Sequence, residues 1–240
     1  MEMMRFFPLF FLFLTWGCAT KYLLPGNRFL TPESQGGAFR GQFEIQKTNA
    51  NEVSIDTTQN TVDRGVLYST ITRTGFLYSN SFFEQFDLYW SHVASANSML
   101  GGKFQFLGGS RTSNSVGHKM SLAAAFGSNE HETDDGVVEF KLGGQEFLLL
   151  YGYRFMESIM AYSTLSQASY NFSGKIHSSN ASLNSQRPNI DSRIISASGG
   201  LEVGVNPVFA KLEFTYQSIN TDKTKAYTNF ITGLSLGLSW

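Results

Sequence analysis

The chain has 240 residues, a formal net charge of −1, 15% aromatic residues and 15% charged residues. A charged share well below the roughly 25% of ordinary soluble domains indicates a surface that does not face water throughout, and near-neutrality argues against nucleic-acid binding. The chain contains no apolar run of about 18 residues, so membrane-spanning helices are not expected either.

The N-terminal segment is predicted to be a targeting signal. Arg5 precedes an apolar run at residues 6–17, which is too short to cross a bilayer as a helix and is typical of a signal-peptide core. Cys18, the only cysteine, follows in the stretch LTWGC, which resembles the lipobox of bacterial lipoproteins. The resemblance implies a signal peptide over residues 1–17, lipidation of Cys18 and sorting to the outer membrane. The alternative is an ordinary signal peptide that is cleaved after Ala19.

Residues 18–36 contain turn residues and two prolines, and we expect them to form a lipidated N-terminal linker that is followed by one domain over residues 37–240. Within that domain apolar and polar residues alternate with a period of two, which predicts β-strands. The segments are long enough to cross a bilayer when tilted, and the prolines fall outside them. Strands are expected near residues 37–48, 65–79, 82–91, 99–107, 117–127, 137–155, 159–174, 193–205, 208–219 and 229–240.

The connections between these strands alternate in length. Residues 79–81, 156–158 and 206–207 form tight turns, whereas the segments 49–64, 128–136, 175–192 and 220–228 are long and polar. Short turns on one side and long loops on the other are typical of an outer-membrane barrel. We therefore predict an all-β, antiparallel, up-and-down transmembrane barrel of about 10 strands, with 8 or 12 as alternatives and with the N-terminus in the periplasm.

The apolar face of each strand is expected to face lipid and the polar face to line the lumen. In the segment 159–174, this assignment places one set of apolar residues outside: Met160, Tyr162, Ala168, Tyr170 and Phe172. The same rule places these charged residues in the lumen: Arg40, Glu44, Arg73, Asp87, Lys103, Lys119, Glu146, Arg154, Glu202, Lys211 and Glu213. A barrel of this size is about filled by its own side chains. The mixture of signs predicts a lumen that charged side chains plug.

The chain ends on ITGLSLGLSW, which resembles the C-terminal strand of bacterial outer-membrane β-barrel proteins. Gly233, Leu236, Leu238 and Trp240 stand at the matching positions. The resemblance implies recognition by the barrel-assembly machinery and a place in the outer membrane of a Gram-negative bacterium, in contact with its lipid.

Three functions follow as hypotheses: a structural or surface-interacting barrel with long extracellular loops, a narrow and weakly selective pore, and a lipid hydrolase. For the hydrolase, HSSNAS at residues 177–182 resembles the His-x-Ser-Asn-Ala-Gly motif of lipid A deacylases, which implies His177 and Ser179 as a catalytic pair. Overall we expect the protein not to be an enzyme. The acidic stretch around His131 is more typical of a solvated loop than of a calcium site. We expect no cofactor, no metal and no nucleic acid, and the partner of the loops stays undefined.

Overall fold

A computed structural model describes residues 21–24, 26–55, 66–94, 96, 98–113, 115–132, 138–176, 189–222 and 226–240. The signal segment, Cys18, His177 and Ser179 lie outside the described residues. None of the described residues forms a helix long and apolar enough to cross a membrane.

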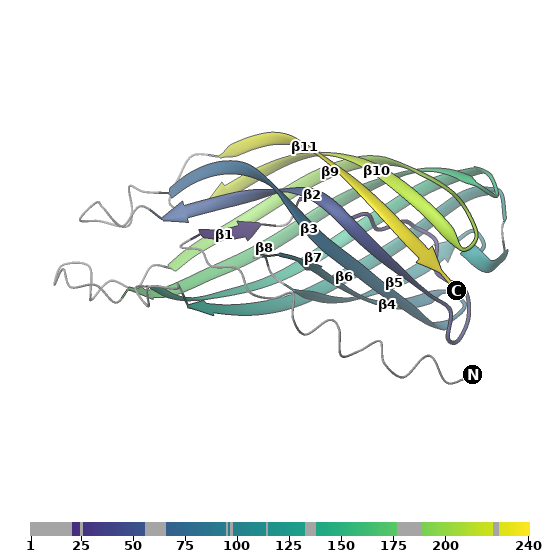
Figure 1. Ribbon diagram of the computed structural model, residues 1–240, viewed down its shortest axis with the longest axis horizontal. Helices are drawn as coiled ribbons and strands as arrows, with labels where there is room; N and C mark the ends of the chain where they lie inside the picture. The colour runs from purple at the N-terminus through teal and green to yellow at the C-terminus, as the bar shows by residue number, and fades with distance from the viewer. Residues whose placement is uncertain are drawn as a thin grey trace.

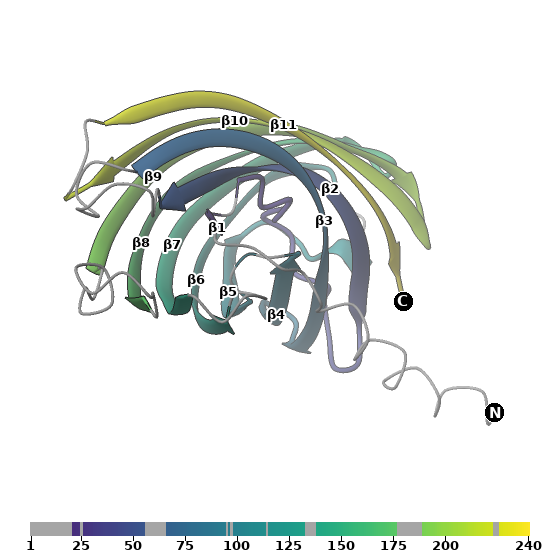
Figure 2. The ribbon, with the colours of Figure 1, turned by 60° about the vertical axis from the view of Figure 1, so that its left-hand side comes forward.

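Ten of the described strands form a closed antiparallel barrel (Figures 1 and 2). They are β2 (Gly41–Ile55), β3 (Val66–Phe83), β4 (Phe86–Val93), β5 (Met99–Leu107), β6 (Gly117–Glu132), β7 (Val138–Met156), β8 (Ile159–Ile176), β9 (Asn189–Val205), β10 (Val208–Thr221) and β11 (Tyr227–Ser239). Each pairs with the next along the chain, and β2 pairs with both β3 and β11 to close the ring. The predicted architecture is therefore confirmed.

Several strands are longer than their sequence pattern predicts, whereas β4 is two residues shorter. β2 continues to Ile55 and β9 begins at Asn189, so residues assigned to long loops extend the barrel instead. The turn predicted at residues 79–81 lies within β3, and the chain reverses at residues 84–85. The long connection at residues 108–116 contains a short 3-10 helix, η3 (Arg111–Ser113).

The outward face of the barrel has two zones along its length. On β10, outward residues from Val208 to Tyr216 are apolar, which is about the 9–11 residues that a tilted strand needs to cross a bilayer core. Ser218 and Asn220, on the same face further along, are polar. We call the apolar zone with the short turns the membrane part. The outer part lies beyond it and comprises residues 138–146, 167–176, 189–194 and 217–221 of β7–β10.

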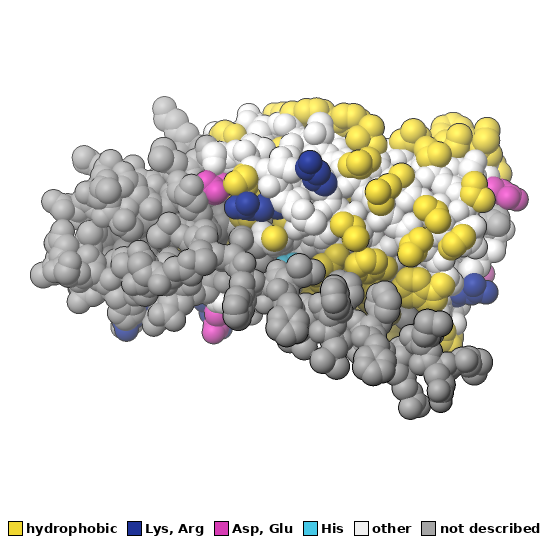
Figure 3. All heavy atoms as spheres, in the orientation of Figure 1, with side chains coloured by type: hydrophobic (Ala, Val, Ile, Leu, Met, Phe, Trp, Pro, Cys, Tyr) yellow, Lys and Arg dark blue, Asp and Glu magenta, His cyan; other side chains and the backbone are white. Residues whose placement is uncertain are grey.

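Apolar side chains gather on the membrane part, toward the end of β11, in the space-filling view (Figure 3). A closed barrel satisfies its backbone hydrogen-bonding groups by strand pairing, and its apolar exterior places hydrocarbon side chains against lipid chains. A lipid environment requires both. The outer part projects beyond this zone with polar residues outside, such as Gln167, Asn171 and Arg193.

The prediction for the face of β8 is wrong. These residues are buried inside the barrel instead of facing lipid: Met160, Tyr162, Ala168, Tyr170 and Phe172. Three of them lie in the outer part, where the outward residues are polar and apolar side chains turn inward. Tyr162 lies in the membrane part, where its hydroxyl donates to Glu213 Oε2 at 3.2 Å. Alternation showed which residues share a face, but not which side that face takes.

A further strand, β1 (Lys21–Leu24), lies inside the ring (Figure 2). β1 pairs with Asn51–Ser54 of β2, on the edge of β2 that faces β11. The pairing of β11 with this edge ends at Thr48, and β1 continues it. Leu23 and Leu24 are buried. The segment predicted as a linker is thus, from Lys21 onward, inside the barrel at the start of the described chain.

Candidate functional site

The lumen is occupied by residues 26–36, which we call the internal segment. It runs beside β2 in the opposite direction. At one end Gly26 contacts the backbone of Asn49, so close that a Cβ atom would lie 2.0 Å from the Asn49 carbonyl oxygen. At the other end Gln35 Nε2 donates to Gln42 Oε1 at 2.8 Å. The chain therefore traverses the barrel from the outer part toward the end where Trp240 and Gly41 exchange backbone hydrogen bonds.

Two charged residues of β10 hold the first half of the internal segment. Glu213 accepts the backbone N–H groups of Arg28 and Phe29, each at 2.9 Å, and Lys211 Nζ donates to the Phe29 carbonyl at 2.8 Å. Phe29 is fully buried with a φ of 55°, a left-handed conformation that is uncommon for a bulky residue. These bonds fix Phe29 in that conformation. Arg28 reaches across to Glu146 on β7, with 2.6 Å between Nε and Oε1.

A buried ion network holds the second half, and Glu33 is its centre. Arg154 on β7 donates to both carboxylate oxygens of Glu33, with 2.7 Å from Nε to Oε1, and Lys119 Nζ lies 3.5 Å from Oε1. Lys103 donates to the backbone carbonyls of Thr31 and Glu33. A buried carboxylate is costly without partners, so these contacts are what allow Glu33 to lie in the lumen as a charged group.

The network continues to the short-turn end of the barrel. Glu202 on β9 accepts from Arg154 at 3.0 Å and from Arg111 at 2.5 Å. Arg111 belongs to η3, so the connection at residues 108–116 folds against the barrel mouth, where its guanidinium also lies 4.7 Å from the Phe209 ring centroid. The internal segment contacts this connection at the barrel mouth, where Arg111 N donates to the Ser34 carbonyl at 2.9 Å.

The lumenal charges expected from the sequence fall into three groups. These residues are buried inside the barrel: Glu44, Asp87, Lys103, Lys119, Glu146, Arg154, Glu202, Lys211 and Glu213. Arg73 is partly buried on the inward face of β3. Arg40 is exposed just before β2, outside the lumen, because strand pairing begins one residue later at Gly41. Most of the predicted set therefore lies together.

Sequence reasoning missed three partners of these charges, namely Arg28, Glu33 and Arg111. They lie in segments without alternation, so no periodic signal placed them in the lumen. A possible signal was an excess of charged and turn residues between the signal segment and the first predicted strand, in GNRFLTPES.

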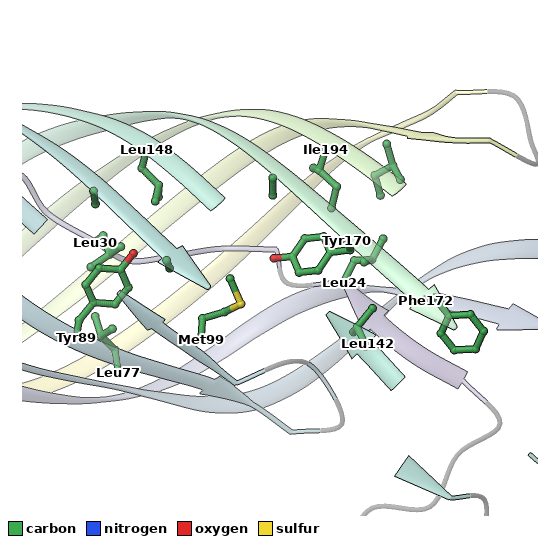
Figure 4. Packing of buried hydrophobic residues seen from close by; sticks show 14 of the residues in the cluster. Leu24, Leu30, Leu77, Tyr89, Met99, Leu142, Leu148, Tyr170, Phe172 and Ile194 are labelled. Carbon is green, nitrogen blue, oxygen red and sulfur yellow. The ribbon is translucent and has the colours of Figure 1, made fainter. Parts of the chain in front are cut away.

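Apolar side chains fill the rest of the lumen (Figure 4). Leu24 and Leu30 contribute from the N-terminal end of the chain, and Leu148, Tyr170 and Ile194 contribute from β7, β8 and β9. The cluster extends from the outer part, with Tyr170 and Ile194, into the membrane part, with Leu77 and Leu148. The internal segment, charged side chains and this cluster thus occupy most of the inside of the barrel, and a cavity of about 470 Å³ remains at the short-turn end, lined by Gln35, Arg111 and Glu202 among others.

The terminal residues close the barrel wall. Leu236, Leu238 and Trp240 face outward, and the Trp240 ring lies 6.1 Å from that of Tyr78. Gly233 faces inward, where a Cβ atom would lie 2.5 Å from the Phe29 ring. Glycine at this position thus leaves room for the internal segment.

Comparison with known proteins returns similarity in fold only. No family model and no curated protein matches the chain. Among solved structures, Neisserial surface protein A is 10% identical with a TM-score of 0.40, over 84% of this chain and 97% of that one. The attachment invasion locus protein Ail of Yersinia pestis, solved with the heparin analogue sucrose octasulfate, is 11% identical with a TM-score of 0.40, over 84% and 99%. The outer membrane protease OmpT of Escherichia coli is 9% identical with a TM-score of 0.38, over 85% and 94%.

Proposed function

We propose that this protein is a Gram-negative outer-membrane β-barrel that its own N-terminal segment holds closed, and that it acts at the cell surface through its outer part. The observation that carries this proposal is the internal segment, which crosses the lumen and bonds to charged residues around the barrel. The apolar zone outside and the polar outer part support the membrane position. The role is structural or interactive at the surface, with a partner that binds the outer part or its connections.

Conductance measurements test the closed state directly. The refolded protein in planar bilayers should give no current steps. A variant lacking residues 21–36 should give discrete steps, because its lumen would lose the segment that fills it. Heat-modifiable migration on gels and a β-rich circular dichroism spectrum would show that both proteins are folded.

The outcomes separate this proposal from the narrow pore. Steps from the wild-type protein would favour the pore and contradict closure. If neither the wild type nor the folded variant lacking residues 21–36 gives current steps, the internal segment is not what closes the lumen. The matched control is the double variant Glu130→Ala, Lys141→Ala, which removes an exposed ion pair. Like the wild type, it should give no current steps.

The same proposal orients the chain in the membrane. The outer part faces the cell exterior and Arg40 faces the periplasm, so β1 lies at the outer end of the lumen. The described chain therefore begins at the exterior end in this orientation, which departs from the expected periplasmic N-terminus. Lys141→Cys, at an exposed position of the outer part, should react with a membrane-impermeant maleimide on intact cells, whereas Arg40→Cys should react only after permeabilisation. The reverse pattern would place the outer part in the periplasm.

Lipidation and assembly belong to the proposal as well. Lipid on Cys18 predicts a mass increase on the N-terminal peptide and its loss in Cys18→Ala. Recognition of the last strand predicts that Trp240→Ala lowers the amount of assembled barrel in membranes. Because Trp240 N donates to the Gly41 carbonyl through its backbone, that variant keeps the closing hydrogen bond. A fall in assembly would thus report on the side chain.

A further inference from the structure

A serine and a histidine meet on the outward face of the barrel. His92 lies near the end of β4, and Ser98 immediately precedes β5. The register pairs Ser91 with Met99, so His92 and Ser98 stand opposite each other and point outward. The His92 Nδ1 atom lies 2.8 Å from Ser98 Oγ, and both residues are partly exposed.

This contact has the geometry of a nucleophile with its base. A hydroxyl becomes an effective nucleophile when an imidazole within hydrogen-bond distance can take its proton. With the ring proton on Nε2, Nδ1 accepts the Ser98 hydroxyl. The ring is also held in place, since the Phe76 ring lies 5.4 Å from that of His92 and packs edge-on against Trp90 at 4.8 Å.

The pair lies at the boundary between the two outward zones. Leu88 and Trp90, the preceding outward residues on β4, are exposed and apolar. Extending the register that pairs Leu100 with Phe126 places Ser128 of β6 next to Ser98, and Ser128 is polar, as is Asn171 further around the same row. Such a boundary is where a bilayer passes from hydrocarbon to headgroups, and there the ester carbonyls of membrane lipids lie.

The surface beside Ser98 leaves room for a substrate. Ser128 pairs with Gly143 on β7, and a Cβ atom at Gly143 would have no heavy atom within 4 Å. The open surface continues into a shallow hollow between β6 and β10, lined by Phe126, Gln145, Asn171 and Arg193. Its lining combines an aromatic ring with hydrogen-bond donors, which suits a molecule that has both an apolar chain and a polar head.

We propose that Ser98 and His92 form a hydrolytic pair that cleaves carboxylic esters of lipids in the leaflet around the outer edge of the membrane part. Ser98 Oγ attacks the ester carbonyl carbon while His92 takes the hydroxyl proton. The carbon–oxygen bond to the leaving alcohol breaks, and His92 returns the proton to that alcohol. Water then attacks the acyl-serine with His92 as base, which releases the fatty acid and restores Ser98. This activity is separate from lumen closure.

The test uses the full-length folded protein with phospholipid in mixed micelles and measures released fatty acid by mass spectrometry. The wild type should release fatty acid, Ser98→Ala should fall to background, and His92→Ala should lose about 10²–10⁴-fold in rate, the usual contribution of a general base. His118→Ala should retain the rate. His118 is the matched control, because it also faces outward and its Nδ1 lies 2.8 Å from a hydroxyl, that of Tyr151.

A covalent probe gives a readout that does not depend on turnover. A fluorophosphonate should add its mass to the peptide that contains Ser98 in the wild type and in His118→Ala, but not in Ser98→Ala. Two results would overturn the proposal: no fatty acid from folded wild type, or release that survives Ser98→Ala. Either could occur while the bilayer experiments still show a closed lumen, so this proposal and the proposed function fail separately.

Discussion

The membrane part and the outer part are built from the same strands, yet they differ in the balance of charged and apolar side chains that they bury. In the membrane part the outside is apolar and much of the lumen is charged, as with Leu212 and Lys211 on β10. In the outer part the outside is polar and the inside mostly apolar, as with Arg193 and Ile194 on β9, although Glu146, Ser192 and Gln217 are also buried there. The outer part thus resembles a water-soluble barrel stacked on a membrane barrel. The solvent around each zone, rather than the strand pattern, decides which face turns inward.

The largest expected effect comes from the charged lumen of the membrane part. Glu33→Ala would leave Arg154 and Lys119 buried without this carboxylate, so the free energy of unfolding should fall by about 3–5 kcal/mol. Denaturant unfolding in micelles, followed by tryptophan fluorescence, measures this loss. Glu130→Ala breaks an exposed pair with Lys141 and serves as control, with little change expected. Equal effects of the two variants would contradict the structural role of the network.

The next effect concerns the apolar inside of the outer part. Ile194→Ala removes a side chain that is 2% exposed and should cost about 2–5 kcal/mol through lost burial and the cavity left behind. Its neighbour Ile195 is 56% exposed at the edge of the lipid zone, and Ile195→Ala should cost less because no cavity forms. The same unfolding measurement compares them. A larger loss for Ile195→Ala would reverse the assignment of the two faces.

The smallest effect locates the boundary between the two parts. Leu212 and Asn220 share the outward face of β10, one within the lipid zone and the other beyond it. Leu212→Arg should destabilise the protein in vesicles by about 2–4 kcal/mol, and Asn220→Arg by about 0–1 kcal/mol, because the cost of a lipid-facing arginine depends on depth. Similar costs at both sites would mean that the membrane zone extends further along the strand.

The sequence predicted the barrel because alternation over long strands is a local property. It also placed charges such as Lys103 and Glu202 together, since inward residues on neighbouring strands share one lumen. The assignment of Tyr170 and Phe172 was wrong because alternation is the same whether the apolar side meets lipid or packs inside. Glu33 and Arg28 could not be placed, since a segment without regular structure is positioned only by tertiary contacts. The Ser98–His92 contact depends on strand register, which the pattern leaves open.

The internal segment also constrains the order in which the barrel can form. Asn27 bonds to Thr215, 188 residues away, and Arg28 to Glu146, 118 residues away. Contacts of such separation form slowly, because a long stretch of chain must first be brought together. Once Trp240 pairs with Gly41, the wall is complete, and side chains as large as Phe29 have no lateral way in. The internal segment must therefore reach the lumen before the last strand closes, or enter afterwards through an end of the barrel.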